Sequence, residues 1–309
     1  MSVLICGSLA YDTIMVFPGK FKNEILPDKV HILNVSFLVP DMRREFGGCA
    51  GNIAYNLKLL GGPALPMGTI GADFGPYQAR LDQLGIPRTH IREIKDTFTA
   101  QAYIVTDMDD NQITAFHPGA MNHSHVQSVP KTGIKLGTVS PDGKEGMVKH
   151  AREFADANIP FLFDPGQGMP MFNGDELKVF IEQASYVALN DYESEVLKHK
   201  TGWNLRQLAE RLDALIVTHG GKGSQIHAGG KVHDIPLASA EATIDPTGCG
   251  DAYRAGLLYG ILNGLDWPTT GRVASLLGAM KVERPGTQNH TFTPESFRAR
   301  FNKEFGYAL

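Results

Sequence analysis

The fold follows from the segment Ile244-Asp245-Pro246-Thr247-Gly248-Cys249-Gly250-Asp251. An extended approach is interrupted at Pro246, small residues follow, and a helix is predicted to begin near Gly250. The first N–H groups of a helix have no partner within it, and the helix dipole favours negative charge beside them. Small residues also allow a phosphate to approach the backbone closely. We therefore expect an anion site at Gly248, Cys249 and Gly250.

Asp251 would lie beside that anion site, in the first turn of the helix. A carboxylate placed there can accept the proton of a hydroxyl group, and an anion site next to a base is what phosphoryl transfer to an alcohol requires. The simpler alternative is a favourable first-turn acid that follows a glycine turn. Asp245, Thr247 and the helix of small residues that follows favour the functional interpretation.

Strand-like and helical segments alternate beyond residue 121. The strand-like segments are 161–163, 187–189 and 215–217, with helical patterns at 148–157 and 205–212 between them. This order predicts an α/β fold whose parallel strands are joined by crossover helices.

Two segments outside this alternation are predicted to form a small β lid. Residues 13–46 are irregular apart from a candidate strand at 35–39, and 97–117 resemble a hairpin around Asp109-Asp110-Asn111. We expect the large domain to contain residues 1–12, 47–96 and 118–309, and the lid to contain 13–46 and 97–117.

Composition and charge exclude several classes of protein. Hydrophobic residues make up 42% of the 309 residues and charged residues 20%, which excludes a disordered chain. The net charge is −4 with no Lys/Arg block, so we expect no nucleic-acid partner. No apolar run is long enough for a membrane span, and the first residues lack the features of a secretory signal. With only three cysteines, we expect no disulfide framework and a cytoplasmic location.

Several catalytic motifs are missing from the sequence. There is no G-x-x-x-x-G-K-[ST] segment of a P-loop kinase, no G-x-S-x-G elbow and no H-E-x-x-H. His117, His123 and His125 cluster in the sequence, but a loop rich in Pro, Gly and Asn is better explained as a solvated junction than as a metal site.

The sequence resembles the ribokinase-like (PfkB-type) carbohydrate kinases. Residues 245–251 match the carboxy-terminal signature of that family and residues 47–54 the amino-terminal one. Asn190-Asp191-Tyr192-Glu193 matches the family's Asn-x-x-Glu, and 218–223 resemble its Thr-x-Gly-x-x-Gly. The four matches occur in family order and extend over nearly the whole chain. The resemblance implies a three-layer α/β/α domain with a mostly parallel sheet, and a small β-sheet lid.

The resemblance also implies that ATP phosphorylates a hydroxymethyl group of a sugar or nucleoside. Asp251 would be the base, and the N–H groups of Gly248, Cys249 and Gly250 would form the anion hole. Most relatives have Ala or Gly at the position of Cys249, and a thiol is nearly as small. A helix start would lower the pKa of this thiol, whereas burial would leave it inert, and the sequence leaves both open. Asp12, Gly48 and Asn52 match the positions that grip the sugar hydroxyls.

The remaining implied sites hold the nucleotide and its cations. Asn190 and Glu193 would organise Mg²⁺, with Glu193 acting through water, although the same pair also suits a helix cap. Asp245 and Thr247, with backbone near Gly286, resemble a monovalent-cation site, which suggests K⁺. The adenine and ribose of ATP would lie against Thr218, Gly220 and Gly223.

The acceptor is predicted to be a nucleoside, with adenosine as the first candidate and its 5′-hydroxyl as the reacting group. Residues 106–114, which include Gln112, resemble the adenosine and broad-specificity nucleoside kinases of the family, and Phe116 is a candidate clamp for the base. The alternatives are a kinase of ribose or a related sugar, and a non-catalytic nucleoside- or sugar-binding protein of the same fold. Monomer and homodimer are both compatible with the sequence.

Overall fold

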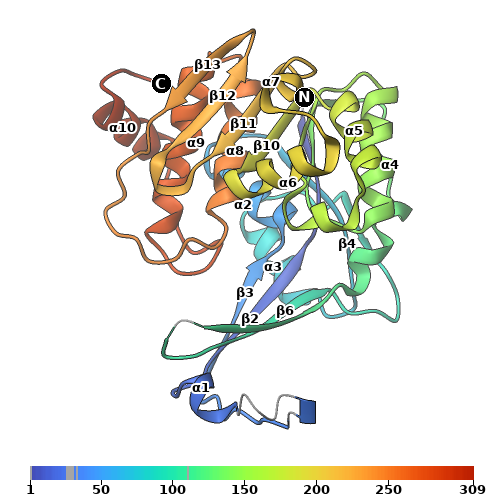
Figure 1. Ribbon diagram of the computed structural model, residues 1–309, viewed down its shortest axis with the longest axis vertical. Coiled ribbons are helices and arrows are strands. Elements are labelled where there is room, and N and C mark those ends of the chain that lie inside the picture. The colour runs from blue at the N-terminus through green and yellow to red at the C-terminus, as the bar shows by residue number, and fades with distance from the viewer. Residues whose placement is uncertain (1, 26–30, 33, 110) are drawn as a thin grey trace.

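The computed structural model describes residues 2–25, 31–32, 34–109 and 111–309. Most of the chain forms one large sheet with helices on both faces (Figure 1). The strands of this sheet are β1 (Ser2–Cys6), β4 (Ala64–Ile70), β5 (His90–Glu93), β8 (Ile134–Val139), β9 (Phe161–Phe163), β10 (Tyr186–Asn190), β11 (Ala214–Thr218), β12 (Ser224–Ala228) and β13 (Lys231–Ile235).

Their order is β13-β12-β11-β10-β9-β8-β1-β4-β5. All pairings from β11 to β5 are parallel, and only β12 and β13 are added in antiparallel fashion. The ligand-binding edge of such a sheet is the one at which the parallel strands end. The predicted α/β fold with a mostly parallel sheet is therefore confirmed.

Two hydrophobic cores lie on the opposite faces of this sheet. Successive residues of β1 alternate between them: Val3 and Ile5 belong to one core, Leu4 and Cys6 to the other. The helices of the first core are α2 (Cys49–Leu59), α3 (Gly75–Gln83), α8 (Cys249–Leu262), α9 (Trp267–Val282) and α10 (Pro294–Phe305). Those of the second are α4 (Lys144–Asp156), α5 (Gly174–Gln183), α6 (Asp191–Thr201) and α7 (Leu205–Ala209). This arrangement gives the three layers.

A second, smaller sheet extends away from the layered body, below it in Figure 1. Its strands are β2 (Ala10–Val16), β3 (Asp41–Gly47), β6 (Ala100–Thr106) and β7 (Gln112–His117), in the order β3-β2-β6-β7. The predicted hairpin is confirmed, because β6 and β7 are antiparallel. Asp110 in its turn, and residues 26–30 and 33 of the predicted lid, lie outside the described residues.

The sequence prediction for the first part of this sheet was wrong in detail. Residues 34–40 belong to no strand, and the strand is β3, which follows them. Its Arg43, Arg44 and Glu45 are charged and consecutive, so β3 lacks the alternation that reveals a half-buried strand. The short helix α1 (Phe21–Glu24) was not expected either. In the part of the chain that the structure describes, no helix has the length and apolar character of a membrane span.

Candidate active site

The start of α8 is left open by its sequence. Gly248 is the N-cap residue, with φ at +79°, and no side chain caps the helix. The Cys249 N–H donates to the Pro246 carbonyl at 3.1 Å, which closes a turn ahead of the helix. Within the described ranges, the N–H groups of Gly248 and Gly250 have no acceptor. The expected anion hole therefore has two available amides among its three residues in this conformation.

Asp251 faces the start of a second helix. The Nδ2 atom of Asn52, on α2, donates to Asp251 Oδ2 at 2.8 Å, although the two residues are 199 positions apart. Gln288 Nε2 donates to Asn52 Oδ1 at 3.0 Å and to the Tyr77 hydroxyl at 2.8 Å. An amide that accepts with its oxygen has its nitrogen free to donate, so Gln288 fixes the orientation of Asn52. Burial raises the pKa of Asp251 to about 6, while the Asn52 hydrogen bond acts against this rise.

Arg254, one turn further along α8, is a residue that the sequence did not single out for the site. Its Nε lies 2.7 Å from Asp164 Oδ2 and its Nη2 donates to Asp164 Oδ1 at 2.9 Å. The same guanidinium lies 3.8 Å from Glu193 Oε2. Arg254 is 6% exposed, and these two carboxylates neutralise its charge. The bidentate pair with Asp164 fixes α8 to the end of β9.

Asp12 and Gly48 lie at the junction of the small sheet with the body. Burial raises the pKa of Asp12 to about 6, with a further contribution from Glu45. A Cβ on neighbouring Gly47 would lie 2.4 Å from Asp12 Oδ2, and one on Gly48 would lie 2.5 Å from the Ser8 carbonyl. The Tyr77 hydroxyl donates to the Gly47 carbonyl at 2.9 Å, which connects this junction to Gln288 and hence to Asn52. The structure thus links the predicted sugar-site residues to Asp251.

Asn190 and Glu193 form a capping box at the start of α6. Asn190 Oδ1 accepts from the Glu193 N–H at 2.7 Å, and Glu193 Oε2 accepts from the Asn190 N–H at 2.8 Å. Burial raises the pKa of Glu193. Among the described residues Oε1 of Glu193 has no hydrogen-bond partner, and an oxygen of this kind fits a water-mediated contact with Mg²⁺.

Thr218, Gly220 and Gly223 lie at the turn that follows β11. Thr218 ends the strand and its hydroxyl donates to the Leu189 carbonyl at 3.3 Å. Gly220 begins the short helix η4 (Gly220–Lys222), and Gly223 has φ at +88° with the Ile235 carbonyl close by. The turn joins β11 to β12 at the same sheet edge as Asn190, so it can line a nucleotide that reaches the start of α8.

Asp245 and Thr247, the residues of the predicted K⁺ site, have hydrogen-bond partners within the chain. Asp245 Oδ1 accepts from the Thr247 N–H at 2.9 Å and Oδ2 from the Gly286 N–H at 2.8 Å. The Asp245 carbonyl accepts from Lys281 Nζ at 2.6 Å. An ammonium group therefore lies beside Asp245, one of the residues predicted to hold the cation.

Three further predicted features have clear positions. Gln112 and Phe116 are exposed on β7, and in the described part of the chain no hydrogen bond joins either to the α8 residues. Burial raises the pKa of the Cys249 thiol to about 11, so the helix start does not activate it. His125 Nδ1 lies 3.3 Å from Glu145, and the described residues include no cluster of three or more His, Cys, Asp or Glu side chains suited to a metal.

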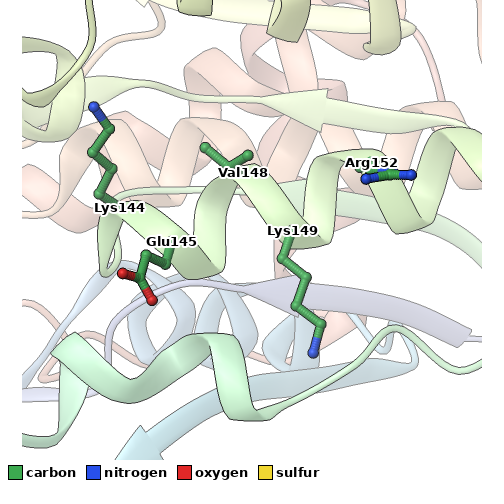
Figure 2. A pocket seen from close by; sticks show the side chains of 5 residues that line it. All are labelled: Lys144, Glu145, Val148, Lys149 and Arg152. Carbon is green, nitrogen blue, oxygen red and sulfur yellow. The ribbon is translucent and has the colours of Figure 1, made fainter.

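A surface hollow on α4 takes no part in this site. Figure 2 shows that its side chains come from one helix and diverge instead of converging on a point. It is lined by Lys144, Glu145, Val148, Lys149 and Arg152. Two buried carboxyls with a raised pKa, Asp251 and Asp12, lie instead at the start of α8 and at the junction of the two sheets, in the segments linked through Asn52 and Gln288.

Comparison with known proteins agrees with this geometry. The family model described as pfkB family carbohydrate kinase matches residues 14–294. A nucleoside kinase of Methanocaldococcus jannaschii is 33% identical over 272 residues, covering 87% of this chain and 90% of the relative.

Solved structures give the same result. The nucleoside kinase of Burkholderia thailandensis in complex with inosine is 53% identical, with a TM-score of 0.91 and full coverage of both chains. The Methanocaldococcus jannaschii nucleoside kinase is 31% identical with a TM-score of 0.90, over 98% of this chain and 99% of that one. An Arabidopsis thaliana ribokinase, 18% identical with a TM-score of 0.78 over 97% and 98% of the two chains, shares the fold.

Proposed function

The chain belongs to the pfkB family of carbohydrate kinases. We propose that it transfers the γ-phosphoryl group of ATP to the 5′-hydroxyl of a nucleoside, with adenosine as the preferred acceptor. Family membership makes it a phosphotransferase with an alcohol group as acceptor. The Methanocaldococcus jannaschii and Burkholderia thailandensis relatives named above are described as nucleoside kinases. The Burkholderia thailandensis enzyme is described in complex with inosine and, in another structure, in complex with ADP-inosine. These support a nucleoside as the acceptor here.

One observation carries the proposal: a carboxylate with a raised pKa lies in the first turn of a helix whose amides are open. At neutral pH Asp251 is mostly ionised, because its pKa is about 6, and it can still accept a proton. The open N–H groups of Gly248 and Gly250 would donate to the oxygens on which negative charge develops in the transferring phosphoryl group. Base and amides belong to the same turn, so their mutual geometry is fixed by the helix.

The acceptor would be held by Asp12, Gly48 and Asn52. A carboxylate accepts hydrogen bonds from two adjacent hydroxyls, and the close backbone approach at Gly48 leaves room for a sugar ring. Asn52 would contact both the sugar and Asp251, which places the reacting hydroxyl next to the base. Gln288 keeps Asn52 in the orientation that this contact needs.

The nucleotide would approach from the edge of the large sheet. Thr218, Gly220 and Gly223 would line its adenosine part, and Glu193 would contact Mg²⁺ through water. Mg²⁺ supplies neutralisation of charge on the ATP phosphates when it is bound. Arg254 fixes the start of α8 relative to Asp164 and Glu193, so it positions the amides and the base.

We propose that the small sheet, with the segments 13–46 and 97–117, acts as a lid over the acceptor. Its β7 strand is exposed, so Gln112 and Phe116 would reach the base of the nucleoside only on closure. Closure would exclude water from the phosphoryl group, which otherwise would compete as acceptor. Protease protection of these segments should increase when a nucleoside is bound, and unchanged cleavage would contradict the lid.

The direct test is an ATP-consumption screen with Mg²⁺ present, across adenosine, guanosine, inosine, cytidine, ribose and fructose. We expect the highest kcat/KM with adenosine and measurable turnover with other nucleosides. A preference for ribose would identify a sugar kinase instead. Nucleoside binding without ATP consumption would identify a binding protein. Asp251→Asn serves as the control for contaminating kinases.

A further inference from the structure

Lys281 is a fully buried lysine near the start of α8. It lies in the last turn of α9 and its side chain is 0% exposed. Its ammonium group donates to the Asp245 carbonyl at 2.6 Å and to the Arg284 carbonyl at 3.3 Å. A charged lysine is almost never buried completely unless it is paired, because loss of hydration is costly. This position therefore calls for a specific role.

The ammonium joins two segments that both reach the catalytic turn. The N–H groups of Ile244 and Asp245 donate to the Val282 carbonyl at 2.8 and 3.1 Å. The carboxylate of Asp245 accepts from the Gly286 N–H, so four hydrogen bonds join residues 244–245 to residues 281–286. Burial would raise the pKa of Asp245, but hydrogen bonds from Thr247 and Gly286 and the nearby Lys281 charge hold that pKa below its usual value. The Asp245 side chain is thus a carboxylate. Burial lowers the pKa of Lys281, and the nearby Asp245 charge acts against that lowering.

The contacts continue from this pair to the open amides and the base. A Cβ on Gly248 would lie 3.0 Å from Thr287 Cγ2, so the turn before α8 packs directly on the second segment. The next residue, Gln288, orients Asn52, which holds Asp251. A displacement at Lys281 would therefore reach both the amides of Gly248 and Gly250 and the carboxylate that accepts the proton.

We propose that the Lys281 ammonium replaces a bound monovalent cation, so that this enzyme needs no K⁺ and Lys281 is the positioning residue for the turn at 245–248. Backbone carbonyl oxygens beside a carboxylate are ligands that suit a hard cation. Here the chain supplies that cation covalently, on a helix that is packed against α8. The kinetic part of this inference depends on the proposed kinase function, but the part on cation binding does not.

The competing explanation is an ordinary helix cap. Lysine side chains near a helix C-terminus often donate to the last carbonyls, and the bond to Arg284 is of this kind. The shorter bond reaches Asp245, 36 positions earlier and in another segment, which a cap does not require. A cap would affect stability alone, whereas a cation replacement would make the variant respond to added cations.

The first experiment compares the wild type with Lys281→Ala at constant ionic strength, in choline chloride and after replacement by K⁺ or NH₄⁺. We expect the wild-type kcat to change less than about twofold, because its site is filled. Lys281→Ala should lose roughly tenfold or more in kcat in choline, as preorganised donors are misplaced, and should recover most of it with K⁺ or NH₄⁺.

Lys149→Ala is the matched control. Lys149 Nζ, on α4, also donates to two carbonyls, those of His125 and Gln127, each at 2.7 Å. Lys149→Ala also removes two lysine–carbonyl hydrogen bonds, but far from α8, so added K⁺ or NH₄⁺ should not change its kcat. A wild-type rate that rises severalfold with K⁺ would overturn the proposal. So would a folded Lys281→Ala that keeps the full rate in choline.

The second experiment is independent of kinase activity. K⁺ or NH₄⁺ should raise the Tm of Lys281→Ala more than that of the wild type or Lys149→Ala, because only this variant has a vacated cation site. In crystals of Lys281→Ala soaked with Rb⁺, anomalous density is expected beside the carbonyls of Asp245 and Arg284. Equal Tm shifts and no such density would overturn the proposal.

If Lys281→Ala does not fold, the cation dependence of the wild type still decides whether the enzyme needs K⁺. If the wild type phosphorylates no substrate, the kinase proposal fails while these measurements still decide the cation question.

Discussion

Two helices begin at the same edge of the large sheet, and they begin in opposite ways. α6 is closed by the capping box of Asn190 and Glu193, which satisfies the N–H of Glu193 within the chain. α8 starts at a glycine with no side-chain cap and leaves amides open. The sequence Asn-x-x-Glu stabilises a helix start through side-chain caps, whereas the Gly-Cys-Gly-Asp start has no such cap.

The first-turn acids show the same contrast. Glu193 turns its carboxylate back onto its own helix, to the Asn190 N–H. Asp251 points across to α2 and accepts from Asn52 instead. A carboxylate that does not cap its own helix leaves the amides for another anion. The α8 start therefore has amides available to a ligand, whereas the Glu193 amide of α6 is used within the chain, and each substitution below tests one side of that difference.

The largest effect is expected from Asp251→Asn. The amide has the shape of the carboxylate but cannot accept the substrate proton, so kcat should fall by a factor on the order of 10² or more. Nucleoside affinity should stay within several-fold, because the sugar contacts are unchanged. Steady-state kinetics and calorimetric titration with nucleoside measure the two quantities. Full activity of the variant would remove Asp251 from the role of base.

Gly248→Ala tests whether the open start depends on glycine. At φ +79° an alanine costs roughly 1 kcal/mol of backbone strain, and its Cβ would press on Thr287 at 3.0 Å. We expect kcat to fall about tenfold, because the amides are displaced. Gly202→Ala is the control, with φ at +72° and open space around the new Cβ. It should show a similar loss of Tm with unchanged kcat, and equal kinetic losses in both would contradict the argument.

How far the sequence predicts this site depends on the range of the interactions. The turn before α8 and the start of this helix were predicted because both are local. The network around Asp251 was not, since Asn52 and Gln288 come from distant segments whose packing no local pattern records. Lys281 was missed for the same reason, as a lysine in a helix is ordinarily a solvated residue.

The two sheets differ in the same respect. The large sheet was predictable because its strands are buried and apolar, whereas β3 carries successive charged residues and hides its period. Spacing also could not show that the Cys249 N–H is used in a turn. The missed strand β3 and the Cys249 amide both depend on backbone hydrogen bonds, which side-chain identity does not reveal.

Asn52→Ala sharpens the contrast through the pH profile. The hydrogen bond from Asn52 lowers the pKa of Asp251, so its loss should raise that pKa above about 6. Activity of the free enzyme needs the ionised base, so the acid limb of kcat/KM should move to higher pH while the maximum falls several-fold. Asn56→Ala, one turn further along α2, removes another buried amide that contacts His290 at 2.7 Å. Its acid limb should stay where the wild type has it, and an unshifted limb in Asn52→Ala would refute the coupling.

The smallest effect separates capping from nucleotide binding at α6. Asn190→Ala and Asn173→Ala each remove the Asn of a capping box, the second at the start of α5. Both should cost about 1 kcal/mol of unfolding free energy, measured by denaturant titration. Because Asn190 also holds Glu193 toward the proposed MgATP site, only Asn190→Ala should raise the KM for MgATP, by a few-fold. If both variants leave this KM unchanged, the Asn190–Glu193 pair only caps α6, and of the two helix starts α8 alone contributes to ligand binding.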